Sequence, residues 1–491
     1  MIHLLLILAL LPLIFTFLFQ FKNRKAAKTL VPPGPPGLPM IGNLHQFVTA
    51  TNLHIHLWKL SRKHGSLMHM KLGPVRILVV SSAKLAKEVL KTQDSVFCSR
   101  PKLLGQQKLS YNCLDIAFSP YSDYWKEMRK VSVVHLFSLK KAQSFRPVRE
   151  DEISRMVAKI QALAASSDRV VVNLSEMVTD LATTLICRTA FGRRYDERGS
   201  ERRRFDRLLR DGQAAMADFY VSDYYSLFSW VDKLSGKLDR LDESWKNLDL
   251  FYQELIDDHL DRKRGKIVEE EEEEDILDVL IRIKEQKVLS SDLTWDHIKA
   301  MLMDIFIAGT DTSIASIIWT MTALMKAPDV MKKVQTEIRE LIGIKCKVDE
   351  VDIQNLSYMR AVINETMRLY PPTPLLLPRE TIDKCILDGY EIQPKTIVYV
   401  NAWAVARDPE YWEDPHAFLP DRFLNSGADI KGNDFRVLPF GSGRRICPGM
   451  YMGLANVELA VANLLYFFDW ELPPGMQEQI LIPIHRWDHN A

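Results

Sequence analysis

The chain has 491 residues, of which 47% are hydrophobic, so it has enough apolar material for a large core. Its formal net charge is +1, which gives no indication of nucleic acid as a partner. The six cysteines are scattered, without a CxxC pair or zinc-type spacing, and indicate reduced thiols rather than a disulfide framework.

The chain opens with an apolar run over residues 4–19, and four basic residues follow it, namely Lys22, Arg24, Lys25 and Lys28. About 18 helical residues rise about 27 Å, close to the thickness of a hydrocarbon core. A cleaved signal peptide carries its positive charge before the apolar run, which is the opposite order. Residues 1–21 are therefore predicted to be an uncleaved transmembrane signal anchor, with the remaining chain in the cytosol.

Residues 22–44 combine a basic segment with a proline-rich hinge. Pro32, Pro33, Pro35 and Pro36 impose an extended, polyproline-like backbone, which makes a semi-rigid spacer. No repeat and no long flexible linker divides the chain beyond it. Residues 45–491 are therefore predicted to form one domain.

The first part of this domain mixes short strands with helices. Residues 71–81 favour strands around a Gly73-Pro74 turn, and residues 83–90 favour a short helix. Residues 98–120 show little periodicity and are predicted to be a loop. A helix is then expected over residues 121–136.

Within that helix, Trp125-x-x-x-Arg129 places two side chains on one face. An indole N–H and a guanidinium on one face make a donor pair for a carboxylate. Taken alone, this spacing more often means packing plus a solvated charge.

Residues 150–265 are helical and strongly charged. The acidic run at 269–274 is typical of a solvated or disordered loop without a catalytic role.

Residues 292–326 predict a long helix, with Asp292 or Thr294 able to cap its start. Its residues 298–324 are apolar nearly all round, so it is expected to be buried in the fold. Polar residues interrupt this run at 310–313. The plain interpretation is a Ser/Thr cluster that bonds its own backbone.

A helix over residues 358–369 carries Glu365-x-x-Arg368, a spacing within salt-bridge reach. The proline-rich segment 371–379 ends it, and strands are expected at 389–392 and 396–401.

The most informative stretch is Pro439-Phe440-Gly441-Ser442-Gly443-Arg444-Arg445-Ile446-Cys447-Pro448-Gly449. It is predicted to be a tight loop, followed by a helix over residues 450–466 with Pro448 in its first turn. Cys447 would then lie at the helix N-terminus, where free N–H groups stabilise a thiolate. Arg445 can provide a counter-charge for an acidic ligand. The alternative for a lone cysteine is a buried free thiol.

The pattern Phe440-x-x-Gly443-x-Arg445-x-Cys447-x-Gly449 resembles the haem-thiolate signature of the cytochromes P450. The other motifs occur in the order expected for the plant microsomal group of that superfamily. The resemblance implies a fold that is mainly α with a smaller β portion, preceded by one transmembrane helix. It also implies haem b, iron protoporphyrin IX, with Cys447 as the iron ligand.

The same resemblance assigns further roles. The propionate-binding residues it implies are Trp125, Arg129, Arg379 and Arg445. Ala308 and Gly309 match the groove for dioxygen, where Thr312 would orient oxygen and water and Asp311 would relay protons. Glu365, Arg368 and Arg422 match a structural charged network. Asp421, next to Arg422, stands where relatives often have Glu.

The implied activity is a monooxygenase that activates O₂ and hydroxylates a small apolar plant metabolite. Because the chain lacks a flavin or Rossmann fingerprint, its electrons would come from NADPH through NADPH–cytochrome P450 reductase. The implied location is the endoplasmic reticulum membrane, with a single pass and a cytosolic domain. The closer likeness, in residues 104–111 and 124–130, is to an aldoxime-oxidising branch, but a phenolic, coumarin or terpenoid hydroxylase is equally admissible.

Two alternatives stay open. One is an isomerase or dehydratase of the same fold acting on an oxime or peroxide without O₂, which the presence of Asp311 and Thr312 disfavours. The other is a catalytically silent haem protein. Its support is the segment from about residue 477 onward, which lacks the family's final hairpin and is expected to be atypical or truncated.

Overall fold

A computed structural model describes residues 31–48, 50–165, 170–195, 199–265, 274–288, 292–345, 347–424 and 427–473. The transmembrane anchor predicted at 1–21, most of the acidic run and the tail from residue 477 lie outside these ranges. So do residues 22–30 of the predicted basic segment.

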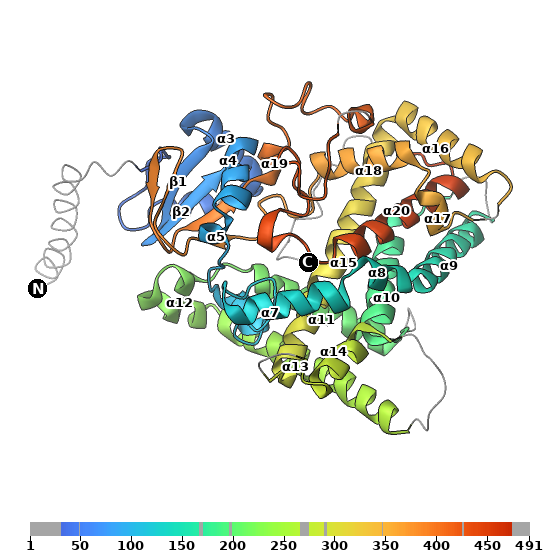
Figure 1. The fold of residues 1–491 in the computed structure, drawn as a ribbon, viewed down its shortest axis with the longest axis horizontal. Helices are drawn as coiled ribbons and strands as arrows, with labels where there is room; N and C mark the ends of the chain where they lie inside the picture. The colour runs from blue at the N-terminus through green and yellow to red at the C-terminus, as the bar shows by residue number, and fades with distance from the viewer. Residues whose placement is uncertain are drawn as a thin grey trace, which may run out of the picture.

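Helices make up most of the described chain (Figure 1). The α-helices are α2 Leu44–Val48, α3 Leu53–His64, α4 Ala83–Lys87, α5 Asp94–Phe97, α6 Leu104–Leu109, α7 Asp123–Val131, α8 Leu139–Ser144, α9 Arg146–Ala164, α10 Leu174–Phe191, α11 Ser200–Ala217, α12 Ser229–Leu234, α13 Lys237–Gly265, α14 Ile276–Glu285, α15 Trp295–Lys326, α16 Pro328–Ile342, α17 Glu350–Ile353, α18 Ser357–Leu369, α19 Ala402–Val405 and α20 Met450–Phe467. Short π or 3₁₀ turns are η1 Glu88–Thr92, η2 Ser132–Leu136, η3 Val221–Asp223, η4 Ser226–Phe228, η5 Pro420–Phe423 and η6 Gly443–Arg445.

The β portion is small and lies at one side of the helices (Figure 1). Its strands are β1 Leu67–Leu72, β2 Val75–Val80, β3 Arg379–Glu380, β4 Cys385–Leu387, β5 Tyr390–Ile392 and β6 Ile397–Val400. One sheet has the order β1-β2-β6-β3, and β4 pairs with β5. β6 runs parallel to β2, with Val79 opposite Tyr399, so residues more than 300 positions apart in sequence join one sheet.

α15 is the central helix of the domain. It packs against α10, α18 and α20, and its residues from Ile298 to Leu324 are mostly buried. Thr294 is its N-cap, one of the two caps expected. Among the described residues, α15 and α20 are long and apolar enough to cross a membrane, but both are largely buried in the fold. This agrees with the expectation of a buried helix at 292–326.

The segment 98–120 differs from the expected loop because it contains α6. Six residues are too few for a periodic pattern to be visible, and tertiary contacts hold the helix in place. The backbone N–H of Leu104 donates to Asp223 Oδ1 over 2.8 Å, and Gly105 lies so close to α11 that an added Cβ would be 2.4 Å from the Ala215 carbonyl oxygen.

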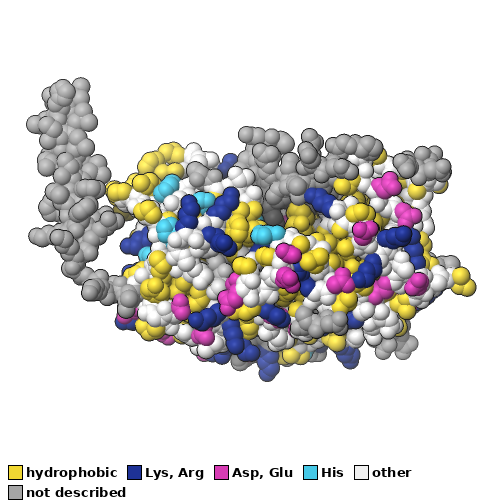
Figure 2. All heavy atoms as spheres, turned by 90° about the horizontal axis from the view of Figure 1, so that it is seen from above, with side chains coloured by type: hydrophobic (Ala, Val, Ile, Leu, Met, Phe, Trp, Pro, Cys, Tyr) yellow, Lys and Arg dark blue, Asp and Glu magenta, His cyan; other side chains and the backbone are white. Residues whose placement is uncertain are grey.

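The surface carries charges of both signs. Figure 2 shows Lys and Arg side chains interspersed with Asp and Glu on one face, with hydrophobic side chains between them. This mixed pattern accords with the near-zero net charge of the sequence.

Candidate active site

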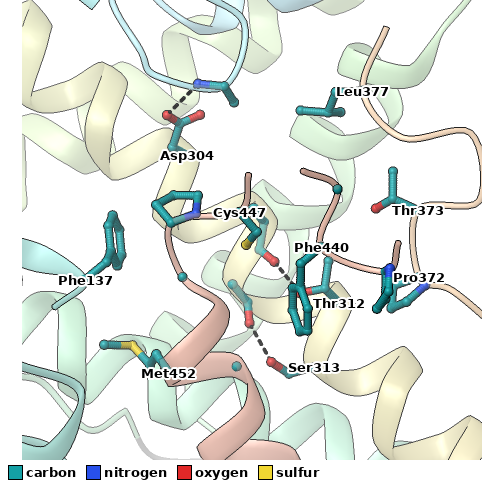
Figure 3. A pocket seen from close by; sticks show the side chains of 18 of the residues that line it. Phe137, Asp304, Thr312, Ser313, Pro372, Thr373, Leu377, Phe440, Cys447 and Met452 are labelled. Atoms are coloured by element: carbon teal, nitrogen blue, oxygen red, sulfur yellow. Dashed lines mark hydrogen bonds between the residues drawn. The ribbon is translucent and has the colours of Figure 1, made fainter. Parts of the chain in front are cut away.

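A cavity of about 310 Å³ lies between α15 and the loop that leads into α20. The segments before α7 and after α18 complete its wall. Figure 3 shows Cys447 from the loop and Thr312 from α15 at this cavity. Apolar side chains form much of the remaining lining, including Ile116, Ile305, Leu376 and Leu377.

The loop that carries Cys447 owes its shape to a glycine and to backbone hydrogen bonds. Gly443 has a φ of +72°, and a Cβ there would lie 2.1 Å from the carbonyl oxygen of Leu90. The Cys447 N–H donates to the Phe440 carbonyl oxygen over 3.0 Å. Phe440, Cys447 and Gly449 line the cavity, whereas Gly443 is not among its lining residues.

α20 begins at Met450 with Gly449 as its N-cap, so Cys447 lies just before the helix. Pro448 therefore precedes the helix, whereas the sequence placed it in the first turn. Burial raises the pKa of the Cys447 thiol, and the Gly449 N–H and the Arg129 charge, which lower it, do not compensate. Burial thus opposes the thiolate that the helix N-terminus and Arg129 favour. A metal cation on the sulfur would supply the missing positive charge.

α15 presents small and hydroxyl-bearing residues to the cavity, namely Ala308, Gly309, Thr312 and Ser313. Thr312 Oγ1 donates to the Ala308 carbonyl oxygen over 2.8 Å, and Ser313 Oγ donates to that of Gly309 over 3.3 Å (Figure 3). Thr312 and Ser313 therefore bond to the backbone of their own helix, as the sequence led us to expect. Each hydroxyl keeps its acceptor lone pairs, because only its proton is used.

Asp311 and Gly309, which flank this cluster on α15, differ in their position relative to the cavity. Asp311 is exposed on α15 and is not among the residues that line the cavity. Gly309 lines the cavity and also meets α10, since an added Cβ would lie 2.5 Å from Ile186 Cδ1. The small size of Gly309 therefore serves helix packing as well as cavity shape.

Of the four residues expected at the propionates, Arg129, Arg379 and Arg445 line the cavity. Trp125 lies behind Arg445, whose guanidinium carbon is 3.9 Å from the indole ring centroid. The Trp125 indole N–H donates to the Ile116 carbonyl oxygen over 2.9 Å. Trp125 thus supports Arg445 rather than facing the cavity itself.

The guanidinium groups donate to backbone carbonyls of the surrounding loops. Arg445 bonds the carbonyls of Cys98, Ile116 and Ser119, and Arg129 bonds that of Ile446. Burial lowers the pKa of Arg445 to about 9, and the nearby Arg379 and Arg129 contribute to this lowering. Several cations share one edge of the cavity, an arrangement that suits a ligand with more than one negative charge.

Three functional candidates were missed in the sequence. Asp94 is buried and accepts from Arg379 over 2.7 Å and from Arg444 over 2.9 Å. Arg100 lines the cavity and donates to the carbonyls of Ala117, Leu377 and Pro378. Asp304 also lines it, and its position as a carboxylate inside an apolar helix was a visible signal.

Glu365, Arg368 and Arg422 lie together away from the cavity. Arg368 makes two bonds to Glu365, of 2.7 and 2.8 Å, and Arg422 reaches Glu365 Oε1 over 3.2 Å. Glu365 also accepts the Leu419 N–H, and Arg368 donates to the carbonyls of Ala406, Pro415 and Ala417. Glu365 and Arg368 are fully buried, so loss of either partner would leave the charge of the other buried and uncompensated.

The cavity has a shape that suits a flat group against α20. A Cβ added at Gly449 or Gly453 would meet no protein atom within 4 Å, and Gly453 also lines the cavity. A thiol, a glycine-bordered slot and a cationic edge are the features that a haem with two propionates needs. The residues present therefore fit this cofactor.

The comparisons identify the class. The cytochrome P450 family model matches residues 32–484, so the chain belongs to the cytochrome P450 family. A zebrafish cytochrome P450 solved with progesterone superposes with a TM-score of 0.72 at 27% identity, covering 86% of this chain and 93% of that one.

Relatives in plants are more similar in sequence. The chain is 50% identical to a 6,7,8-trihydroxycoumarin synthase of Pastinaca sativa, over 95% of this chain and 92% of the relative. It is also 50% identical to a 5-OH-xanthotoxin synthase of Ammi majus, over 94% of this chain and 91% of that relative. A third relative, cytochrome P450 71B36 of Arabidopsis thaliana, is 44% identical over 96% of each chain.

These findings confirm the expected fold and the expected activity class. The protein is a plant cytochrome P450 of specialised metabolism, a haem-containing monooxygenase that hydroxylates a small plant metabolite. Haem is its cofactor, and NADPH supplies electrons through a reductase, as is general in this family. Plant members of the family are typically membrane-bound.

Proposed function

We propose that this enzyme hydroxylates the aromatic ring of a coumarin or furanocoumarin. The observation that carries the proposal is the apolar cavity with Cys447 and Thr312 at its wall, combined with the names of the relatives. Leu376, Leu377 and Ile305 offer flat, apolar surface to a fused ring. Among the substrate classes left open by the sequence, these relatives favour a coumarin over an aldoxime, a simple phenol or a terpenoid.

Cys447 would hold the haem iron, and the haem supplies the activation of dioxygen when it is bound. Arg129, Arg379 and Arg445 would bind the propionates, with Trp125 supporting Arg445 from behind. This role requires some guanidinium N–H groups to exchange loop carbonyls for carboxylate oxygens, which are stronger acceptors. Arg100 is a further cation at the same edge.

Glycines and one aromatic residue would fit the chain around the cofactor. Gly449 would allow close approach of the ring, Gly443 would set the turn before Cys447, and Phe440 would cover one part of the slot. Ala308 and Gly309, on the α15 wall of the cavity, would leave room for dioxygen.

Thr312 would control the proton at the reacting oxygen, because its lone pairs remain available to a water in the cavity. Asp311, which directly precedes Thr312 on α15 and is exposed, would exchange protons with that water. The Glu365, Arg368 and Arg422 network would stabilise the fold of the haem-binding domain and take no part in chemistry.

The enzyme would lie at the endoplasmic reticulum membrane, with its domain in the cytosol and the reductase as its electron donor. In support, exposed apolar side chains occur in the hinge segment, in η4 and on α12, namely Leu38, Met40, Leu227, Trp230 and Leu234. The hinge segment is joined to the start of η4 by a hydrogen bond of 2.8 Å from the Tyr225 hydroxyl to the Met40 carbonyl oxygen. A lipid surface would cover side chains such as Leu227, which is 88% exposed.

The cofactor part is tested by the reduced carbon monoxide difference spectrum in microsomes. We expect a strongly red-shifted Soret band in the wild type that is lost in Cys447→Ala. Cys98→Ala is the matched control, because Cys98 is a buried thiol that does not line the cavity. A red-shifted band that persists in Cys447→Ala would contradict the assignment of the iron ligand.

The substrate part is tested with NADPH and added reductase. Dihydroxycoumarins, xanthotoxin and an aromatic aldoxime are offered separately, and products are detected by mass. We expect a gain of one oxygen atom on a coumarin or furanocoumarin. Turnover of the aldoxime alone would overturn the substrate proposal while leaving the monooxygenase class intact.

A further inference from the structure

Residues 115–119 form a strap between α15 and the arginines at the edge of the cavity. Ile116 and Ala117 line the cavity. Both of their backbone N–H groups donate to Asp304 Oδ2, over 2.9 and 3.3 Å. Figure 3 shows Asp304 in such a bond at the cavity wall.

The carbonyl groups of the same strap bond to cations on the other side. Arg100 donates to the Ala117 oxygen over 2.9 Å, and Arg445 donates to the oxygens of Ile116 and Ser119 over 3.2 and 2.7 Å. Ile116 and Ala117 are thus each held by the Asp304 carboxyl at the backbone N–H and by a guanidinium at the backbone carbonyl.

Asp304 has a second acid beside it. Asp115 is fully buried, and its Oδ2 accepts the Phe118 N–H over 2.7 Å. The two carboxyls lie beside each other, because Asp304 accepts the N–H groups of Ile116 and Ala117 and Asp115 that of Phe118 on the same strap, and each carboxyl affects the pKa of the other. Two ionised carboxyls have no proton to share, so a hydrogen bond between them requires a proton on one of them. Without that proton, Asp115 Oδ1 is a buried oxygen that accepts no hydrogen bond.

We propose that Asp115 and Asp304 share one proton and that this acid pair is a positioning device that fastens the strap to α15. With the proton shared, both oxygens of the contact are satisfied and the strap N–H groups keep a strong acceptor. When the pair loses this proton, two buried carboxylates face each other and repel, so the strap detaches from α15.

The charges around the pair support a single negative charge at neutral pH. Burial raises the pKa of Asp115 to about 6 and raises that of Asp304 well above its usual range, with Asp115 adding to the second effect. Other titratable groups face the pair from the packed elements, namely Arg100, Cys113, Tyr124, Arg129, Tyr252 and Arg445.

The positive and negative charges at the edge of the cavity balance when haem is bound as proposed. Arg100, Arg129 and Arg445 carry three positive charges, while the charge of Arg379, one of the propionate ligands proposed above, is balanced by Asp94. Two propionates and a singly charged acid pair carry three negative charges. In this respect the inference rests on the proposed function, whereas the strap and its bonds rest on this chain alone.

The test is hydrogen–deuterium exchange of the holoenzyme, read on peptides that cover residues 115–119 between pH 6.5 and 9.5. Rates are corrected for intrinsic exchange, and a peptide within α10 reports global stability. We expect protection at Ile116 and Ala117 to fall at least tenfold in the wild type as pH rises. The carbon monoxide spectrum of the same samples reports haem, so a failed haem assignment is distinguishable from a failed acid pair.

Three variants decide the proposal. Asp304→Asn and Asp115→Asn each place an amide donor where the shared proton was, so we expect the strap to stay protected and the pH dependence to disappear. Asp304→Ala removes the acceptor, so we expect rapid exchange at every pH. Asp223→Asn is the matched control, because Asp223 also holds a backbone N–H of the same loop region, and it should keep the wild-type profile.

The proposal is overturned if either Asn variant keeps the wild-type pH dependence, or if the wild type shows none. It is also overturned if Asp304→Ala remains as protected as the wild type. Should Asp304→Ala fail to fold, the two Asn variants still decide the outcome.

Discussion

Arg379 Nη1 donates to Asp94 Oδ1 over 2.7 Å, and this ion pair, between β3 and α5, is almost completely buried. The residues are 285 positions apart in sequence. Asp94 also accepts the backbone N–H of Arg444, so the pair ties the sheet to the loop that carries Cys447.

Asp94→Asn is expected to destabilise the protein strongly, because it leaves the Arg379 charge buried without its counter-ion. Breaking such a pair costs about 3–5 kcal/mol. The measurement is unfolding in denaturant. The control is Asp421→Asn in the exposed pair with Lys333, where a loss of about 0–1 kcal/mol is expected. Equal effects of the two variants would contradict this prediction.

Gly443→Ala is expected to prevent formation of the Cys447 loop. The added methyl would be 2.1 Å from a backbone oxygen and the residue would keep a φ of +72°. Gly389→Ala is the matched control, because Gly389 also has a positive φ, of +79°, but its methyl would meet no atom within 4 Å and the residue does not line the cavity. Thermal unfolding compares them; a stable Gly443→Ala protein with the wild-type haem spectrum would refute the steric argument.

Glu458, on α20, is expected to make stability pH-dependent. Burial raises its pKa to about 7, against the opposing effect of Arg360 and Lys431. The folded state therefore favours the protonated acid, and its stability is lost as pH rises from the unfolded value to about 7. Glu458→Gln should match the wild type near pH 4.5 and exceed its stability at pH 8 by about 1–3 kcal/mol. A difference between the two proteins that does not vary with pH would exclude this explanation.

Thr312→Ala is expected to lower the product formed per NADPH consumed while leaving the carbon monoxide spectrum unchanged. General acid–base groups contribute about 10²-fold or more, so a loss of at least tenfold is expected. Thr320→Ala is the control, because Thr320 makes the same type of backbone bond, over 2.7 Å, but does not line the cavity. Equal coupling of oxygen to product in both variants would remove Thr312 from the mechanism.

Much of this architecture could be predicted from local patterns. The glycine-rich turn, Cys447 and the following helix occupy one continuous stretch, and the apolar run from 298 to 324 indicated a buried helix. Such features depend on residues close in sequence, where spacing determines which side chains share a face.

The remaining features depend on contacts between distant segments. Nothing near Trp125 shows that its indole N–H is taken by Ile116, or that Arg445 then stacks on its ring. α6 is too short to leave a periodic signal. Asp304 was recognisable as a charge in an apolar helix, but its partner Asp115 lies in a segment without periodicity, so the pair becomes visible only in three dimensions.

The contact between Gly309 and Ile186 has a consequence for how the cavity can diversify. A methyl group at position 309 would meet Cδ1 of Ile186 at 2.5 Å, so the two side chains share one small volume. Enlarging one residue requires trimming the other, for example by pairing Gly309→Ala with Ile186→Val. Descendants of this enzyme can therefore change the breadth of the cavity at position 309 only by coordinated substitution on two helices, which restricts the routes to new substrates.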